Sequence, residues 1–330
     1  MMTSKPTMTE PVWAPPGALS RLRPEACGLL TELNERIRRS GDPVLLELVR
    51  IRVAQLIGNP AAVRVRCAYA AAAAGPELEA KVAALPDYPG SPLFSAPERN
   101  VVAFTEQFVM DVGGTTQDMR ADLAGRFGAD GAQALVTAIY VVEFTQRLQL
   151  IAARLLADAG ASAAGSVAAV DASPAGLLDA YQAAVVRGSA LDPVTTELVR
   201  LRCARTHHCR ICQTLRLAGA RAAGVDDAMT AKVDFYERSD LPERAKVALR
   251  VTDAFITRPD LLPEAGAGQA RASFGPAELA SLCLDITKWS TQKIKVALAT
   301  DGADRLVTDT DGVALFGFDQ AGQPTGFQRR

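Results

Sequence analysis

The sequence predicts an all-α protein with two tandem helical-bundle repeats and a short C-terminal β-hairpin. Apolar residues recur at three- and four-residue spacing, as in Val194, Leu198 and Leu201, which is the period of an amphipathic helix. Ala, Leu, Arg, Glu and Gln dominate, and all of them favour helices. Strand signals are nearly absent before the tail, and segments of the first half recur in the second.

One segment recurs almost unchanged. Residues 42–53 (DPVLLELVRIRV) return as residues 192–203 (DPVTTELVRLRC), 150 positions later. Further landmarks follow in the same order at separations of 147, 147 and 146 positions: Thr105–Phe108 with Thr252–Phe255, Phe127-Gly128 with Phe274-Gly275, and Thr145-Gln146 with Thr291-Gln292. Landmarks that keep one order at a slowly drifting separation indicate a duplicated unit of about 150 residues.

The repeat defines the expected domain organisation. We expect an N-terminal extension (1–23), a first repeat (24–158), a linker (159–173), a second repeat (174–301) and a C-terminal tail (302–330). The linker is rich in Ala, Gly and Ser, a composition typical of flexible connections.

Local signals place the ends of several elements. Asp42-Pro43 and Asp192-Pro193 suit helix starts, with Asp as the N-cap and Pro at the first helical position. Gly58 and Gly219 are expected near helix ends or bends. In the tail, residues 306–308 and 313–316 flank Asp311-Gly312 and predict a hairpin, although a disordered tail fits equally well. The tail carries no evident chemistry.

Composition and charge argue against nucleic-acid-binding and membrane proteins. Hydrophobic residues make up 48% and charged residues 22% of the chain, and the net charge is −1, with basic and acidic residues interspersed. We therefore expect no nucleic-acid partner, and the Arg50/Arg52 and Arg200/Arg202 stretches suggest solvated or salt-bridged helix faces. No apolar run of about 18 residues and no signal-peptide pattern is present, so we expect no membrane partner and a cytoplasmic location.

Six cysteines divide into two groups. Those at 27, 67, 203 and 283 stand apart within helical patterns and are expected to be small buried hydrophobic residues. Cys209 and Cys212 instead form a CxxC motif directly after a predicted helix break at residues 206–208. A new helix is expected to continue from the motif through Leu215, Ala218 and Ala222.

The CxxC spacing favours redox chemistry. Residues three apart on a helix share a face, close enough for a disulfide with modest adjustment. A thiol in the first helical turn lies near unpaired N–H groups, which favour the thiolate and lower the thiol pKa. A thiolate that attacks a peroxide becomes a sulfenic acid, and a neighbouring thiol converts this to a disulfide.

Three other residues near the motif could take part in its chemistry. Glu197 precedes Cys209 by twelve residues, on the preceding helix, and is either a general base for a thiol or a partner of Arg200 or Arg202. His207 and His208 are the only histidines in the chain. A metal site built from these residues is the less favoured interpretation, because a single CxxC lacks a second ligand pair. We predict no bound metal and no cofactor.

A Glu, a twelve-residue step and a CxxC on a short Ala-rich helical unit resemble the alkylhydroperoxidase D / carboxymuconolactone decarboxylase family. The resemblance covers residues 24–157 and 174–301, including the Thr-Asp-Ala-Phe and Phe-Gly-Pro-Ala-Glu-Leu segments. In the peroxidatic members of this family the second cysteine attacks the hydroperoxide, the first resolves it and the Glu relays protons. The resemblance thus implies Cys212, Cys209 and Glu197 in these roles.

The chain departs from the family pattern at two positions. The family commonly has His just before the second cysteine and again four residues after it, where this chain has Ile211 and Arg216. Arg216 can stabilise a thiolate but cannot shuttle a proton near neutral pH. His207, His208 and Arg216 are therefore auxiliary candidates.

The first repeat departs further. It keeps Glu47, but Asn59, Ala62 and Arg66 stand where Cys209, Cys212 and Arg216 stand in the second repeat. Without a thiol this repeat is expected to be a structural partner, with Glu47 in a packing or salt-bridge role. The resemblance implies assembly into a homo-oligomer, a dimer or trimer.

Three functions follow in order of preference. The first is an antioxidant alkylhydroperoxidase, a peroxiredoxin-type oxidoreductase in which Cys212 and Cys209 cycle through a disulfide that an external dithiol reductant protein reduces. The second is a lactone decarboxylase-like lyase whose small acidic substrate is bound by an arginine among Arg50, Arg66, Arg200 and Arg216. The third is a non-catalytic assembly module.

Overall fold

The structure is a computed structural model that describes residues 15–157, 173–302, 306–308 and 312–326. The linker expected at 159–173 therefore lies outside the described residues, apart from Ser173. Residues 1–14 of the expected N-terminal extension lie outside them as well.

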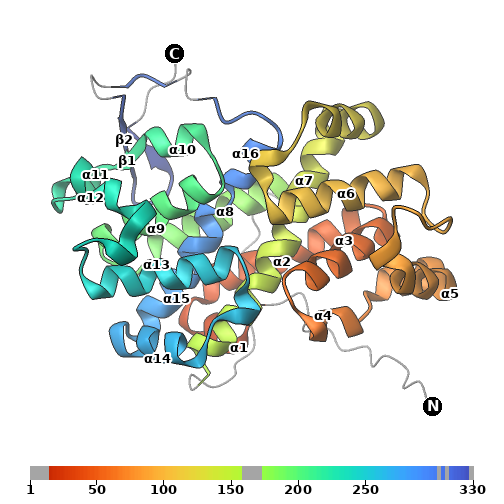
Figure 1. Cartoon of the computed structure of the whole chain (residues 1–330), viewed down its shortest axis with the longest axis horizontal. Coiled ribbons are helices and arrows are strands. Elements are labelled where there is room, and N and C mark those ends of the chain that lie inside the picture. Colours follow the sequence, from red (N-terminus) through yellow and green to blue (C-terminus); the bar gives the residue numbers. More distant parts are fainter. Residues whose placement is uncertain (1–14, 158–172, 303–305, 309–311, 327–330) are drawn as a thin grey trace.

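Helices make up most of the described chain, and the predicted all-α class with short C-terminal strands is confirmed (Figure 1). The first half contains α1 (Gly17–Leu22), α2 (Pro24–Ser40), α3 (Pro43–Leu56), α4 (Pro60–Arg64), α5 (Ala68–Ala84), α6 (Ala96–Met110) and α7 (Gln117–Leu155). The second half contains α8 (Pro174–Arg187), α9 (Pro193–Thr206), α10 (Arg210–Thr214), α11 (Ala218–Ala222), α12 (Asp227–Ala231), α13 (Glu243–Ile256), α14 (Glu264–Ser273), α15 (Pro276–Trp289) and α16 (Gln292–Ala297). Short 3-10 turns are η2 (Leu85–Asp87), η3 (Val112–Gly114), η4 (Lys232–Arg238) and η5 (Pro259–Leu261), and the strands are β1 (Leu215–Leu217), β2 (Ala314–Phe318) and β3 (Pro324–Thr325).

The predicted starts of α3 and α9 are confirmed. The Asp42 carboxylate accepts hydrogen bonds from the backbone N–H groups of Val44 and Leu45, and Asp192 accepts one from Thr195. Each helix then begins with Pro, whose missing N–H costs nothing at this position. These caps fix where the two helices that carry Glu47 and Glu197 begin.

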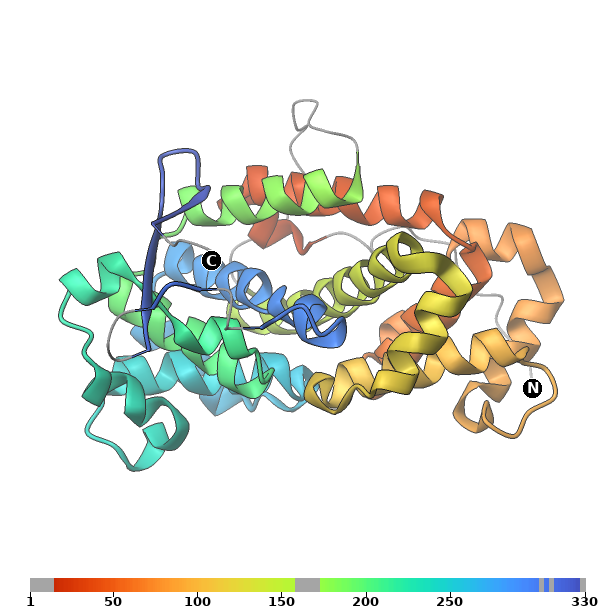
Figure 2. The same cartoon turned by 90° about the horizontal axis from the view of Figure 1, so that it is seen from above.

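Helices at matching positions in the two halves pack against each other. α2 lies beside α8 along one edge of the molecule (Figure 2), and α7 packs against α15. Two contacts between loops also join corresponding parts of the two halves. A Cβ added at Gly58 would collide with the Asp260 carboxylate, and one added at Gly113 would lie 2.7 Å from the His208 ring. Because His208 follows Gly58 by 150 positions and Asp260 follows Gly113 by 147, each half contacts the other through corresponding loops.

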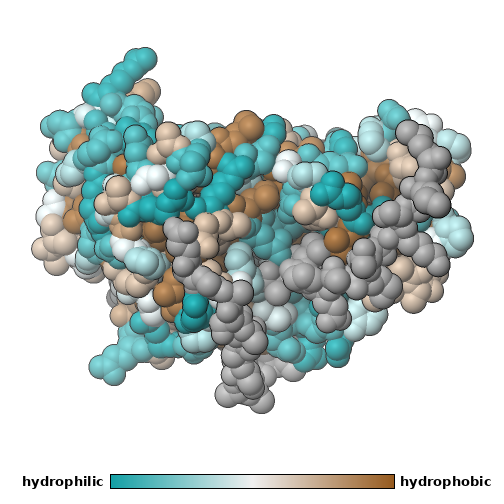
Figure 3. Space-filling view, turned by 90° about the horizontal axis from the view of Figure 1, so that it is seen from below, coloured by the Kyte–Doolittle hydropathy of each residue, from teal (hydrophilic) through white to brown (hydrophobic). Residues whose placement is uncertain are grey.

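The largest cluster of buried apolar side chains runs from Leu19 to Ala297 and includes residues of both halves. α7 contributes many of them and bends at Gly128, where a φ of 71° suits glycine. The apolar stretch of α7 has the length and hydropathy of a membrane span, but 78% of it is buried inside the protein, as expected for a core helix. On the face drawn in Figure 3, apolar and polar residues are interspersed.

A buried charge cluster joins α7 to α16. The Glu143 carboxylate accepts hydrogen bonds from Arg147 Nε at 2.8 Å and from Lys293 Nζ at 2.9 and 2.8 Å. Arg147 also donates to the backbone carbonyls of Phe255 and Thr257. Burial lowers the pKa of Lys293 to about 8. One carboxylate therefore compensates two buried cations at the junction of the two halves.

The segment after the CxxC motif differs from the prediction. The helix expected through Leu215, Ala218 and Ala222 is wrong, because α10 ends at Thr214, residues 215–217 form β1 and α11 starts only at Ala218. β1 pairs in parallel with β2, with Leu215 opposite Ala314. A strand partner that lies so far along the chain leaves no local signal in the sequence.

The tail forms a hairpin, but its two strands are not the predicted pair. β2 pairs antiparallel with β3, and Gly317 lies opposite Thr325. The connecting turn contains Gly322, whose φ of 78° requires a glycine-like conformation. Leu306 forms an isolated bridge instead of belonging to a strand, and Asp311 of the expected turn lies outside the described residues.

We predict that Glu143→Ala lowers the free energy of unfolding by about 3–5 kcal/mol, because Arg147 and Lys293 would be left buried without a counter-charge. Denaturant unfolding followed by circular dichroism measures this change. The control is Glu32→Ala, which removes a half-exposed ion pair with Arg36 and should change the free energy by less than about 0.5 kcal/mol. Equal effects of the two substitutions would contradict the prediction.

Candidate active site

The CxxC motif forms a tight turn between α9 and α10. α9 ends at Thr206, so the predicted break is confirmed, and Cys209 is the N-cap of the short helix that contains Cys212. The Cys209 N–H donates to the Ala204 carbonyl at 3.0 Å. On the other side, buried Asp301 accepts a bond of 2.9 Å from the Arg210 N–H. The turn is thus attached to the preceding helix and to the segment after α16.

The two sulfurs have different environments. Cys209 is fully buried, whereas Cys212 is partly exposed and lines a cavity of about 830 Å³. Residues of α7, α8, α10, α15 and α16 form the walls of this cavity, and β2 and β3 of the tail contribute to it as well. A small molecule in the cavity therefore meets Cys212 and not Cys209.

Hydrogen bonding makes the two thiols unequal as acids. The Cys209 thiol donates to the Cys212 sulfur, which lowers the pKa of Cys212, and the nearby charges of Lys295 and Arg200 lower it further. The same hydrogen bond, together with burial, raises the pKa of Cys209. Ionisation of the pair is therefore easier at Cys212 than at Cys209. This is the order of acidity that an attacking and a resolving cysteine require.

Glu197 is buried, and Arg200 bonds both of its carboxylate oxygens. Arg200 Nε and Nη2 lie 2.7 and 2.8 Å from the two oxygens. The same guanidinium donates to the backbone carbonyls of Cys212, at 2.8 Å, and Leu215. We call this unit the Glu–Arg clamp. It holds the backbone at the end of α10, so the structure places Glu197 in contact with Arg200 while Arg200 reaches the CxxC turn.

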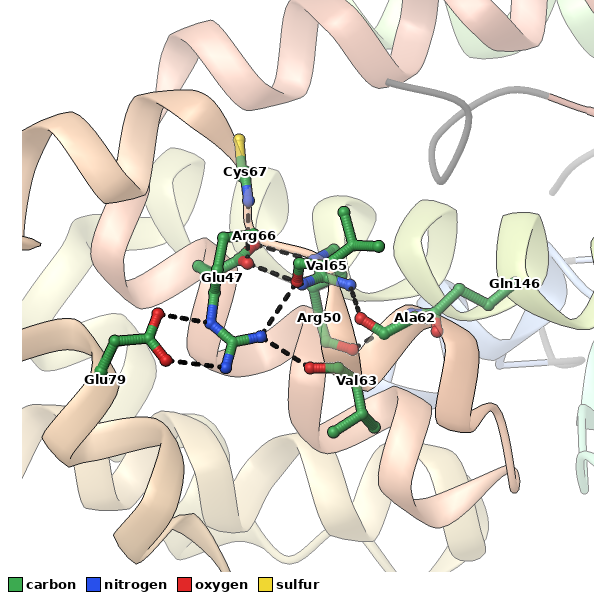
Figure 4. A network of polar contacts seen from close by, with 9 residues as sticks. All are labelled: Glu47, Arg50, Ala62, Val63, Val65, Arg66, Cys67, Glu79 and Gln146. Atoms are coloured by element: carbon green, nitrogen blue, oxygen red, sulfur yellow. Dashed lines mark hydrogen bonds and ion pairs between the residues drawn. The ribbon is translucent and has the colours of Figure 1, made fainter. Parts of the chain in front are cut away.

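The same clamp is present in the first half, which has no CxxC motif (Figure 4). Arg50 Nε and Nη2 lie 2.8 and 2.6 Å from the Glu47 oxygens, and Arg50 also donates to the carbonyls of Ala62 and Val65. Glu47 additionally accepts a bond from the Cys67 N–H at 3.0 Å. A clamp that persists without thiols has a structural role. Of the two alternatives expected for these helix faces, solvated or salt-bridged, Arg50 and Arg200 follow the second, because both are buried and ion-paired with Glu47 and Glu197.

The auxiliary candidates lie outside the cavity lining. His207 is buried against Phe144, and its Nε2 lies 3.1 Å from the Ser290 hydroxyl. Burial lowers the pKa of His207 far below its usual value, so its ring is neutral. His208 adopts a φ of 54°, at the position that Gly58 occupies in the first half. Arg216 donates to the Gln213 and Leu215 carbonyls.

The arginines proposed for carboxylate binding are engaged within the protein. Arg66 bonds the Glu79 carboxylate and the Val63 carbonyl, as Figure 4 shows. Only Arg200 of the four lines the cavity among the described residues, and its clamp uses all three guanidinium nitrogens. Within the described part of the chain, no three His, Cys, Asp or Glu side chains converge in a way that could hold a metal ion.

The sequence did not reveal a second set of site residues, which lie around a helix break and line the same cavity as Cys212. α15 ends at Trp289 and α16 begins at Gln292, and Lys288, Trp289, Gln292 and Lys295 line the cavity. The separation between corresponding residues of the two halves drops from 147 to 146 positions in this region. This drop is the sequence signal that indicates the break. The sequence indicated no evident chemistry for the tail, whereas Phe316 and Phe318 form part of the cavity wall.

The first half has no equivalent break, because α7 continues through the corresponding position. There Gln146 donates to the Arg50 carbonyl at 3.1 Å and accepts from Asn59 at 3.5 Å. Gln292, at the matching position, is buried, and neither its amide nitrogen nor its amide oxygen has a partner among the described residues. The second half thus leaves buried polar atoms without partners at a position where the first half satisfies them internally.

The four isolated cysteines are buried, as predicted. Cys27, Cys203 and Cys283 are fully buried, and burial raises the pKa of each to about 12. Cys67 is the N-cap of α5 and is 8% exposed. The thiols of Cys27, Cys203 and Cys283 are therefore protonated and inert at neutral pH.

Comparison with known proteins gives one family and two relatives. The sequence model of the carboxymuconolactone decarboxylase family matches residues 174–233, which include Glu197 and both cysteines of the motif. Uncharacterized proteins from Mycobacterium tuberculosis strains CDC 1551 and H37Rv are each 34% identical over 256 residues, covering 72% of this chain and 89% of theirs. No solved structure matches.

We predict that Glu47→Gln and Glu197→Gln lower the free energy of unfolding by similar amounts, on the order of 3 kcal/mol, because each leaves a buried arginine without its counter-charge. Denaturant unfolding of both variants tests this. The prediction is wrong if Glu197→Gln leaves stability unchanged and only slows thiol chemistry, because Glu197 would then act as a proton relay.

We also predict that iodoacetamide alkylates Cys212 first at pH 7, since its pKa is lowered and it is accessible from the cavity. Cys209 and the four isolated cysteines should react only after unfolding. Peptide mass spectrometry of partially labelled protein locates the label. Labelling of Cys209 before Cys212 would reverse the assignment of the attacking thiol.

Proposed function

The chain belongs to the carboxymuconolactone decarboxylase family, and from this starting point we propose that it is a thiol-dependent hydroperoxide reductase with Cys212 as the attacking thiol and Cys209 as the resolving thiol. The observation that carries the proposal is the asymmetric pair at the cavity. Cys212 is accessible from the cavity and has a lowered pKa, and buried Cys209 donates a hydrogen bond to it.

The proposed cycle starts with attack of the Cys212 thiolate on the terminal oxygen of a hydroperoxide. The O–O bond breaks, the organic part leaves as an alcohol, and Cys212 becomes a sulfenic acid. Cys209 then attacks this sulfur, a disulfide forms and water leaves. An external dithiol reductant restores both thiols, so the reaction needs no bound cofactor. A reducing cytoplasm would supply such a reductant.

The alternatives receive less support. A lyase that binds a carboxylate through arginine would need a free guanidinium in the cavity, whereas Arg200 is already engaged by Glu197 and two carbonyls. A purely structural module would not need an accessible cysteine with a lowered pKa beside a cavity. In this proposal the first half, which lacks the thiols, serves as a structural partner. Further assembly into a homo-oligomer also belongs to the proposal.

We predict that Cys212→Ser abolishes hydroperoxide consumption with a dithiol reductant. Cys209→Ser should retain one turnover and then accumulate over-oxidised Cys212, because no thiol is left to trap the sulfenic acid. Steady-state peroxide assays and intact mass measure the two effects. Cys67→Ser is the matched control, since serine is a good N-cap for α5 and the thiol lies in the first half.

Hydroperoxide consumption that continues at the full rate in Cys212→Ser would overturn the proposal. Activity on another substrate that survives complete thiol alkylation would point to a lyase instead.

A further inference from the structure

The cavity is lined by a buried lysine, Lys288, whose ammonium group has no hydrogen-bond partner among the described residues. Lys288 is 5% exposed, yet its Nζ makes no hydrogen bond and no ion pair within 4 Å in the part of the chain that the structure describes. It lies 3.2 Å from the centroid of the Trp289 ring and 4.7 Å from that of Phe318. Cation–π contacts thus hold the group in place while its N–H bonds remain available to a ligand in the cavity.

From this geometry we propose that Lys288 is the proton donor to the leaving oxygen of the hydroperoxide that Cys212 attacks. The inference rests on the proposed reductase function. Lys288 lines the same cavity as Cys212, and the two charges are close enough to interact. Ile211 and Arg216, which flank Cys212 in the sequence, release no proton near neutral pH, so another group must supply it.

The acidity of Lys288 fits this role. Burial lowers its pKa to about 7, and the positive charges of Arg200 and Lys295 also lower it. Asp285 and the Cys212 thiolate act in the opposite direction. Because proton transfer is most efficient when the pKa of the donor lies near the working pH, a lysine in this state can act as a general acid.

Gln292 offers a way to hold the substrate beside Lys288. It is also 5% exposed, lines the cavity and has an unpaired amide oxygen and nitrogen. A hydroperoxide group can donate its O–H to the amide oxygen and accept a hydrogen bond from the amide nitrogen. Such a ligand would satisfy buried polar atoms that are otherwise left without partners.

The step balances in atoms and protons. The Cys212 sulfur forms a bond to the terminal oxygen, which keeps its hydrogen, and the O–O bond breaks. The other oxygen takes a proton from the Lys288 ammonium and leaves as an alcohol. Condensation of Cys209 with the sulfenic acid then releases water and leaves Lys288 neutral. When the external dithiol reduces the disulfide, neutral Lys288 accepts the Cys212 thiol proton, and the thiolate–ammonium pair is restored.

The test compares two oxidants that differ in their leaving group. An alkyl hydroperoxide must release an alkoxide, which needs a proton, whereas a peracid releases a carboxylate, which does not. Rapid-quench mass spectrometry of the reduced full-length chain measures the rate at which Cys212 is oxidised by cumene hydroperoxide or peracetic acid. No physiological reductant is needed for this measurement.

We expect Lys288→Met to slow oxidation by cumene hydroperoxide by about 100-fold and to change oxidation by peracetic acid by less than about threefold. Lys288→Arg should show the same pattern, because arginine keeps the charge but does not release a proton near neutral pH. In the unaltered protein the cumene hydroperoxide rate should fall as the pH rises through about 7, and this fall should be absent in Lys288→Met.

Several results would overturn the inference. Equal slowing with both oxidants would mean that Lys288 only stabilises the thiolate, and full activity of Lys288→Arg would mean that its charge alone matters. Iodoacetamide reactivity of Cys212 and thermal unfolding check that the variants keep the turn intact, and Lys232→Met, on the surface, is the control. Loss of the proposed function itself is recognised separately, because Cys212→Ser would then leave peroxide consumption unchanged.

Discussion

The buried Glu–Arg clamp is the interaction on which the candidate site depends. A carboxylate and a guanidinium that are both buried stabilise each other only when the remaining donors also find acceptors. In both halves they find them in two backbone carbonyls of the short helix and turn that follow. The clamp therefore fixes the path of the chain after α3 and α9, and in the second half it fixes the position of Cys212.

The two halves differ in what surrounds this common scaffold. In the first half a continuous α7 lets Gln146 bond the Arg50 carbonyl and the Asn59 amide, so the region is internally satisfied. In the second half the helix breaks after Trp289, and the side chains near the break line a cavity instead. A helix break, two cysteines and the strands of the tail thus distinguish the candidate site from the corresponding region of the first half.

Burial supports the proposed chemistry in opposite ways for different groups. It keeps Cys27, Cys203 and Cys283 protonated, since an isolated buried thiolate would lose its hydration. At the CxxC turn the Cys209 hydrogen bond outweighs burial for Cys212. At Lys288 burial outweighs the nearby negative charges and brings the pKa close to neutrality. A cysteine and a lysine that both have lowered pKa values therefore line one cavity.

The helical class, the caps at Asp42 and Asp192 and the break before Cys209 follow from sequence alone, because they depend on local propensity and hydrogen bonds between near neighbours. The internal repeat stays a prediction, supported by corresponding helices and clamps. Tertiary structure decided the strand at 215–217, the role of the tail and the partner of Glu197. It also decided the surroundings of Lys288. These features depend on side chains and strands that come together from distant parts of the chain, where pairing and burial, rather than local spacing, determine which groups meet.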